Sequence, residues 1–340
     1  MILIAATIKD VAKLAGVSVA TVSKHINGII VKERNRIRIE DAVRTLDFKV
    51  NIIARGLKTN KTMTVGVLIP SLENIFATSI ISHVEHILLQ HGYSTIVCDY
   101  NHDADLENSK FDFLMGKSVD GIILMPLGIS EERIKKALGI GTPIVLIDRP
   151  IQGIECDVVL ADNVNASYNA VEQLIARGHK RIGIICGPQN IYTARERLEG
   201  YLRIHDDYHM PVSDNYIRYG DYEMQSGYGL MKELMDMESP PTAVYITNYE
   251  MTLGAVMAIN ERNIKIPEEL SVIGFDNLQL AGVVKPNLWI VMQPIRQIAE
   301  LAAGTILRRL KGEKNNFPSM IRLKTDLVPG QSIRDISIQP

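Results

Sequence analysis

Ten short apolar runs, separated by stretches with helical periodicity, occupy the sequence between residues 64 and 293. The runs are rich in β-branched residues and almost continuously apolar, as in TVGVLIP (64–70) and RIGIICG (181–187). Such strands are typical of parallel sheets that helices cover on both faces. Ten strands are many for one open sheet, so we predict two α/β lobes.

Doubly wound sheets bind ligands beyond the carboxyl ends of their strands. The polar residues at those ends here are Asp148, Arg149, Asn248 and Asp276. Any one of them alone is better explained as a helix cap or a loop residue. Four residues that the fold brings to one edge favour a binding site.

The charged residues are distributed unevenly along the chain. The whole chain carries a formal net charge of −2, but residues 1–62 contain 12 Lys and Arg against 5 Asp and Glu, which gives +7. The remaining residues therefore carry −9. A basic segment on an acidic body suggests that the segment binds a polyanion, with chance clustering of charge as the alternative.

Cysteine usage and hydropathy indicate a soluble protein that stays in the cytoplasm. Cys98, Cys156 and Cys186 lie far apart and form no CxxC pair, which is typical of reduced thiols. The apolar start MILIAA is too short for a signal peptide, and no window reaches the roughly 18 apolar residues of a membrane span.

The first 28 residues contain two short helical patterns separated by a glycine. Thr7 is placed to cap a helix whose first turn carries Asp10, an anion at the positive end of the helix dipole. Gly16 ends that helix, and Ser18 caps a second one from about Val19 to Ile26. The side chains that we expect at the contact between the two helices are Val11, Ala12, Leu14, Ala15, Val22 and Ile26.

A third, basic segment, KERNRIRIEDAVRTLDF (32–48), is predicted to cover this pair through Ile37, Val43, Leu46 and Phe48. Two helices joined by a tight glycine turn indicate a DNA-binding helix-turn-helix, in which the second helix contacts base edges and phosphates. A generic helical hairpin is the alternative, but it would not need a hydroxyl-rich front. That front consists of Ser18, Val19, Ala20, Thr21, Ser23 and Lys24.

Motifs for catalysis, cofactors and metals are weak or missing. The sequence has no GxSxG, no phosphate-binding loop and no GxGxxG after a strand, so we expect no enzyme and no cofactor. DYNHDAD (99–105) resembles the start of a calcium loop, but Ala104 and Lys110 occupy the positions of its glycine and glutamate. We predict a strand-to-helix loop with a capping acid there, and no metal site.

Motifs along nearly the whole chain resemble the lactose-repressor family of bacterial transcription regulators. They are TIKDVAKLAGVSVATVSKHIN (7–27), NIIARGL (51–57), VDGIIL (119–124), PIVLIDR (143–149), GHKRIGIICGP (178–188), RLEGY (197–201) and LSVIGFDN (270–277). The resemblance implies an α/β protein with a three-helix helix-turn-helix domain (1–50), a hinge helix and linker (51–62), and a two-lobed, periplasmic-binding-protein-like core (63–340).

Each lobe of that core is expected to be Rossmann-like. The N-lobe would comprise residues 63–162 and 293–321, and the C-lobe residues 163–292 and 322–340. The chain would cross between them near Asp162, Met292 and Arg322, leaving a cleft.

The resemblance also implies that the hinge helix forms on the operator and lies in the minor groove, where Leu57 is wedged between base steps. Lys24, His25 and Val50 depart from the family's usual residues, which affects the operator sequence more than the binding itself. The DNA-contacting residues expected are Thr7, Ser18, Val19, Ala20, Thr21, Ser23, Lys24, Asn27, Asn51, Ala54, Arg55 and Leu57.

The expected function is that of a homodimeric repressor on double-stranded operator DNA, controlled by a small effector in the cleft. The residues expected to bind the effector are Phe76, Asp148, Arg149, Arg197, Tyr222, Asn248 and Asp276. Two arginines, with Tyr249 in place of the family's aspartate, favour a sugar acid or sugar phosphate over a neutral sugar. In the alternative, Arg149 merely pairs with Asp148 or another local acid.

Three other functions remain open at this point. One is a global catabolite regulator that a partner protein controls. The others are a two-lobed solute-binding protein, which would need an export signal, and an enzyme on the same scaffold. Neither of the last two explains residues 7–28.

Overall fold

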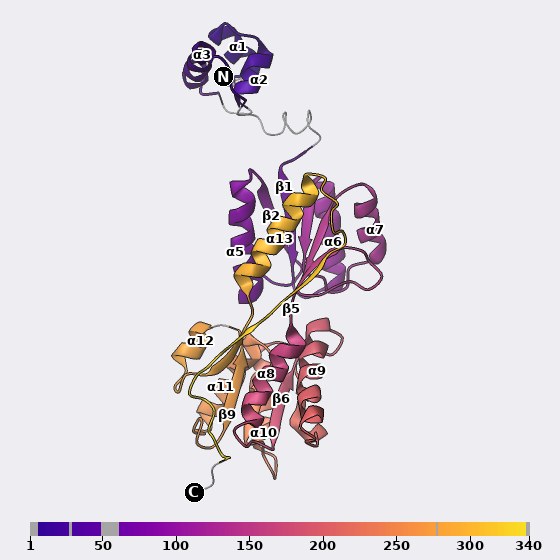
Figure 1. Cartoon of the computed structure of the whole chain (residues 1–340), viewed down its shortest axis with the longest axis vertical. Helices are drawn as coiled ribbons and strands as arrows, with labels where there is room; N and C mark the ends of the chain where they lie inside the picture. Colours follow the sequence, from indigo (N-terminus) through magenta and orange to yellow (C-terminus); the bar gives the residue numbers. More distant parts are fainter. Residues whose placement is uncertain (1–5, 27–28, 49–60, 277, 338–340) are drawn as a thin grey trace. The chain divides into compact units, whose positions relative to one another are not determined.

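The computed structural model describes residues 6–26, 29–48, 61–276 and 278–337 (Figure 1). The chain divides into two compact units, Met1–Thr62 and Met63–Pro340. Five residues that are predicted to contact DNA lie outside the described residues, namely Asn27, Asn51, Ala54, Arg55 and Leu57.

The small unit contains the helix pair that the sequence predicts and a third helix: α1 (Ile8–Ala15), α2 (Val19–Ile26) and α3 (Glu33–Thr45). Thr7 caps α1 in a capping box, because the Asp10 amide donates to Thr7 Oγ1 and the Thr7 amide donates to the Asp10 carboxylate. Gly16 ends α1 in the left-handed conformation, with φ of +59°. The predicted glycine turn is confirmed.

The core of this unit differs from the prediction at two positions. Leu14 is 53% exposed and Ile37 is 48% exposed, so the expected contacts of both side chains are wrong. At 100° per residue, Ile37 lies opposite the face of α3 that carries Val43 and Leu46, and Leu14 lies beside the buried stripe of α1. The side chains that are buried are Val11, Ala12, Ala15, Val22, Ile39 and Ala42.

The first lobe of the large unit, the N-lobe, is built on a parallel six-stranded sheet in the order β11-β5-β4-β3-β1-β2. Helices α5 and α13 cover one face, and α6 and α7 cover the other (Figure 1). The bounds are β1 Thr64–Ile69, α5 Ile75–Gln90, β2 Ser94–Asp99, α6 Ala104–Gly116, β3 Gly121–Leu124, α7 Glu131–Gly139, β4 Ile144–Ile147, β5 Asp157–Ala161, α13 Ile295–Leu310 and β11 Met320–Leu323.

The second lobe, the C-lobe, repeats this plan with the order β12-β10-β9-β8-β6-β7, in which β12 is antiparallel to β10. Helices α8 and α9 cover one face, and α10 and α11 cover the other. The bounds are α8 Asn163–Ile175, β6 Ile182–Cys186, α9 Tyr192–Asp207, the 3-10 helix η1 Asp214–Tyr216, β7 Ile217–Tyr219, α10 Met224–Met235, β8 Ala243–Ile246, α11 Tyr249–Glu261, β9 Ser271–Phe275, α12 Leu278–Val283, β10 Trp289–Met292 and β12 Asp326–Val328.

All ten apolar runs of the sequence form strands, and the predicted two-lobed α/β fold is confirmed. The chain passes from one lobe to the other after β5, after β10 and after β11. Asp103 caps α6 by accepting from the amides of Asp105 and Leu106, which is the capping role predicted for the DYNHDAD loop. In the parts of the chain that the structure describes, no helix combines the length and apolar character needed to cross a membrane.

Candidate nucleic-acid interface and ligand cavity

The front of α2 presents the predicted row of side chains. Ser18, Val19, Ala20 and Lys24 are exposed, while Thr21 and Ser23 are half-buried. Ser18 Oγ accepts from the Thr21 amide at 3.2 Å and so caps the helix as expected. Val19 is exposed although it is apolar, which leaves its methyl groups available to a thymine methyl in a major groove.

Thr7 is exposed, but its hydroxyl already donates to the Asp10 carboxylate at 2.7 Å. A phosphate contact by this hydroxyl would therefore compete with the cap of α1.

The back of α2 contains a charge contact that sequence reasoning missed. His25 Nε2 lies 3.8 Å from Glu40 Oε1 on α3, and Arg36 Nη1 lies 2.8 Å from the same carboxylate oxygen. Arg36 also pairs with Glu33. The contact of His25 with Glu40 connects the two helices, and the two pairs of Arg36 lie within α3. The residues were visible in the sequence, but their pairing depends on the rotation of α3.

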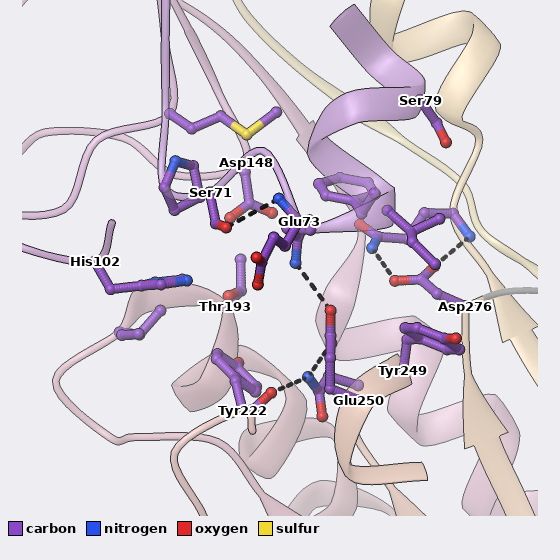
Figure 2. A pocket seen from close by; sticks show the side chains of 18 of the residues that line it. Ser71, Glu73, Ser79, His102, Asp148, Thr193, Tyr222, Tyr249, Glu250 and Asp276 are labelled. Carbon is purple, nitrogen blue, oxygen red and sulfur yellow. Dashed lines mark hydrogen bonds between the residues drawn. The ribbon is translucent and has the colours of Figure 1, made fainter. Parts of the chain in front are cut away.

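A cavity of about 670 Å³ lies between the lobes, at the carboxyl ends of the strands of both sheets. Ligand sites of soluble proteins typically have about 300–1,000 Å³. All seven residues that the sequence nominates for the effector line this cavity: Phe76, Asp148, Arg149, Arg197, Tyr222, Asn248 and Asp276. Figure 2 shows ten of the lining residues by name, drawn from both lobes.

On the N-lobe side, Asp148 follows β4 directly and has a φ of +74°. Arg149 lies beside it, with Nη2 3.1 Å and Nε 3.2 Å from Asp148 Oδ2. The alternative pairing expected for Arg149 is therefore present, and the pair lines the cavity. Because the guanidinium is already neutralised, it is a weak anchor for a ligand anion.

On the C-lobe side, the first helical turns of α9 bring Arg197 to the cavity. Its guanidinium is buried, donates from Nε to Asn163 Oδ1 at 2.8 Å and from Nη1 to the Thr247 carbonyl at 2.6 Å, and stacks 3.9 Å above the Phe275 ring. These contacts fix its plane. Among the hydrogen bonds of the described residues, none uses Nη2, which is therefore available to a ligand oxygen.

Asp276 follows β9 at the junction of the lobes, with a φ of +58°. Its carboxylate accepts from the backbone amide of Gln293 at 3.4 Å and from Gln293 Nε2 at 2.8 Å. Burial raises the pKa of this carboxyl to about 6, and the nearby charge of Arg197 offsets part of that increase.

Asn248 belongs to the cavity wall, and both the oxygen and the nitrogen of its side-chain amide form hydrogen bonds there. Its Oδ1 accepts from the Met251 amide and caps α11, while Nδ2 donates to the Tyr222 carbonyl at 3.0 Å and to Glu250 Oε2 at 2.7 Å (Figure 2). Glu250 Oε1 accepts from Nδ2 of Asn74, an N-lobe residue, at 3.2 Å. This hydrogen bond connects the two lobes across the cavity.

Aromatic rings complete the wall. Phe76 lies in the first turn of α5, Tyr249 begins α11, and Tyr222 has a φ of +73°. A Cβ at position 187 would lie 2.2 Å from the Tyr222 ring, so Gly187 is required for the ring to pack there.

Several lining residues were missed by sequence reasoning, namely Glu73, Asn74, His102, Thr193, Glu223, Glu250 and Gln293. Most of them follow the same rule as the residues that were found, because they lie just beyond a strand or in the next helical turn. Over the described ranges, no group of three or more His, Cys, Asp or Glu side chains is arranged to hold a metal ion.

Comparison with known proteins finds a matching family model for each of the two units. A model of "Bacterial regulatory proteins, lacI family" matches residues 7–51, and a model of "Periplasmic binding proteins and sugar binding domain of LacI family" matches residues 62–308. The chain is 32% identical to the HTH-type transcriptional repressor PurR of Actinobacillus pleuropneumoniae serotype 3 (strain JL03), over 98% of this chain and 99% of that protein.

Two further likenesses are similarly extensive. The chain is 34% identical to catabolite control protein A of Priestia megaterium, over 90% of this chain and 93% of that protein. The structure of a transcriptional regulator CelR–cellobiose complex superposes with a TM-score of 0.73 at 27% identity, covering 96% of this chain and 99% of the other. These relatives are transcriptional regulators. With its helix-turn-helix unit and its two-lobed core, the chain belongs to the lacI family of bacterial regulatory proteins.

Proposed function

We propose that this DNA-binding transcriptional regulator is a repressor whose operator affinity responds to a small sugar-like ligand bound between the core lobes. The observation that carries the proposal is the cavity of about 670 Å³, lined by all seven nominated side chains and by residues of both lobes. Its aromatic rings suit the C–H faces of a sugar, while carboxylates, amides and Arg197 Nη2 suit its hydroxyls. Cellobiose, the sugar in the CelR complex, agrees with this class.

The structure argues against the expected preference for an acidic ligand. Arg149 is neutralised by Asp148, and the described lining contains five carboxylates against two guanidiniums. An anionic sugar would meet an excess of like charge. We therefore propose a ligand without a negative charge.

DNA binding is assigned to the small unit, acting in a homodimer on a palindromic operator. One helix-turn-helix contacts too little DNA for high specificity, so two copies and two half-sites are needed. Residues 1–62 carry +7, so salt should weaken binding steeply. The minor-groove role of residues 51–58 remains part of this proposal. Because operator DNA lies in the nucleoid, we propose that the protein acts at the nucleoid, in the bacterial cytoplasm.

A path of polar contacts connects the cavity with the opposite lobe. Arg197 Nε donates to Asn163 Oδ1, Asn163 Nδ2 donates to Glu196 Oε2 at 3.3 Å, and Glu196 Oε1 lies 2.7 Å from Nη1 of Arg322. Arg322 belongs to β11 of the N-lobe sheet, whereas Glu196 belongs to α9. A ligand that contacts Arg197 would thus act on a contact between the lobes. A typical coupling of this kind changes DNA affinity by about 1–3 kcal/mol.

The test begins with a thermal-shift screen of neutral sugars and sugar acids against the intact chain. Calorimetry and an operator gel shift then follow any hit in Arg197→Ala and Asp276→Ala. Glu85→Gln, an exposed carboxylate of α5 that does not line the cavity, serves as the control. We expect both cavity variants to lose ligand affinity and the response on DNA. If both variants bind and respond normally, the cleft site is wrong.

The similarity to catabolite control protein A gives one alternative some support, namely control by a partner protein. The two functions differ in a direct way. If a partner protein controls the repressor, no sugar changes its operator affinity. Fractions of a cell extract that contain only macromolecules then do change the operator affinity.

A further inference from the structure

The charge that lines the cavity is unusually one-sided. Among the described lining residues, the carboxylates are Glu73, Asp148, Glu223, Glu250 and Asp276, and the guanidiniums are Arg149 and Arg197. Asp148 and Arg149 neutralise each other at 3.1 Å. Arg197 is fixed by Asn163, the Thr247 carbonyl and the Phe275 ring. The carboxylates on the C-lobe side therefore outnumber the cations there.

Two of these carboxylates are held only by neutral donors. Glu250 accepts from the amides of Asn74 and Asn248, and Asp276 accepts from the backbone and side-chain amides of Gln293. Within the described part of the chain, neither has a Lys, Arg or His nitrogen within 4.0 Å. Burial raises the pKa of both carboxyls, and the charge of Asp276 raises that of Glu250 further. Buried carboxylates of this kind favour a cation nearby.

The same wall also carries an acceptor without a donor. Gln293 is 5% exposed and lines the cavity, and its Nε2 is used by Asp276. Its Oε1 is buried and has no hydrogen-bond partner. A buried acceptor without a donor is costly, and an N–H or O–H donor that reaches it would remove that cost. The wall at Glu250 and Asp276 thus combines two carboxylates that have no ion-pair partner among the described residues with one acceptor that has no donor.

We propose that the ligand carries a protonated amine that binds at the Glu250 and Asp276 wall, which makes it an amino sugar rather than a neutral or acidic sugar. An ammonium group has three donors and no acceptor, and it supplies the missing charge. A hydroxyl supplies one donor and no charge. This inference rests on the proposed function, because it specifies the ligand of the same cavity.

The remaining polar groups suit the rest of such a ligand. Arg197 Nη2 faces no acceptor among the described residues and can donate to a ring hydroxyl, while Phe76 and Tyr249 offer apolar faces. Figure 2 shows Glu250, Asp276 and Tyr249 on one side of the cavity. The amine would therefore bind at one wall of the cavity, and the hydroxyls would bind at another.

The test compares matched sugars on the intact protein at pH 7. Glucosamine, galactosamine and mannosamine are each measured by calorimetry beside the parent hexose and the N-acetyl derivative, which has no charge. We expect at least one amine to bind about tenfold or more tightly than both neutral partners, and the same amine to change operator affinity. Glu250→Gln should reduce that preference to about threefold or less, whereas Glu85→Gln should leave it unchanged.

Glu223→Gln, an exposed carboxylate at the cavity rim, gives a second measurement if Glu250→Gln does not fold. It should weaken the preference for the amine without abolishing it. A parent hexose or N-acetyl sugar that binds as tightly as its amine would overturn the inference and leave the proposed function standing. Failure of all three amines to bind at millimolar concentration would overturn it as well. The proposed function fails as well if neutral sugars are also without effect.

Discussion

Asp276→Asn should stabilise the core at alkaline pH, although the residue lies in the proposed binding site. The carboxyl of Asp276 has a pKa of about 6 against an ordinary value of 3.8, and the residue is 8% exposed. Because the folded-state pKa lies above the unfolded one, the folded state holds the proton more tightly. Ionised Asp276 therefore lowers the free energy of unfolding. This loss is complete above about pH 7 and vanishes below about pH 4.

The magnitude follows from about 1.36 kcal/mol for each pKa unit. Ionised Asp276 costs the folded state about 3 kcal/mol at pH 8 and about 1.5 kcal/mol at pH 5. Asparagine carries no charge at either pH, but it retains only one oxygen for the two Gln293 donors, which costs about 1 kcal/mol. We expect a net gain in the free energy of unfolding of about 1–2 kcal/mol at pH 8 and almost none at pH 5.

The assay is urea unfolding of the intact chain at fixed protomer concentration, followed by circular dichroism at both pH values. Asp206→Asn, an exposed carboxylate near the end of α9, controls for the loss of one negative charge. A gain of equal size at pH 5 and pH 8 would refute the reasoning, because it could not come from a titrating carboxyl. A net loss at pH 8 would do the same.

Four further results are expected. Ile39→Ala should destabilise the small unit by about 2–5 kcal/mol and abolish operator binding in a gel shift while calorimetry still detects ligand, whereas Ile37→Ala should change stability by less than about 1 kcal/mol. Thr7→Ala should cost about 1 kcal/mol in thermal unfolding of the small unit, because the capping box of α1 is lost. Arg322→Ala should leave ligand affinity nearly unchanged in calorimetry but reduce the effect of ligand on operator affinity, and an unchanged effect would remove Glu196 and Arg322 from the coupling path. Raising salt from 50 to 200 mM should weaken operator binding by about 10³-fold or more in fluorescence anisotropy, and a salt-independent affinity would contradict the assignment of the basic unit.

Most of the fold could be predicted because its signals are local. Most of the ten apolar runs are short, β-branched and buried, and all ten form strands, although β2 and β7 at the sheet edges are only partly buried. The strands β11 and β12 were missed because MIRL and DLV are edge strands with charged residues among their apolar ones. Their sequences are like those of loops, and the segments form strands because a neighbouring strand pairs with them. Ile39 was missed for another reason. It lies four residues before Val43 and seven before Leu46 and so shares their face of α3, but the prediction chose Ile37 instead.

Many residues that line the site could be predicted from the sequence, but the charge contacts among them could not. Strand ends and the family resemblance led to seven residues, and all seven line the cavity. The pairing of Arg149 with Asp148 and the contact of Asn74 with Glu250 both depend on side-chain positions that no local pattern specifies. Asn74 and Glu250 are 176 residues apart in the chain. The expected preference for an acidic ligand was drawn from counting arginines without knowing which carboxylates surround them.

The order of the strands has a consequence for synthesis on the ribosome. The N-lobe sheet is nearly complete once β5 ends at Ala161, but α13, which begins at Ile295, covers one of its faces with buried Ala299, Ala302, Ala303 and Ile306. Roughly 130 residues separate the two, which at about 5–20 residues per second is about 7–26 s of elongation. During that interval α5 is the helix available to cover that face of the sheet, and a nascent chain leaves Val145 and Val159 without the cover that α13 later provides. The lobe that is begun first is therefore completed only after most of the other lobe has been made, and chaperones would find their target there.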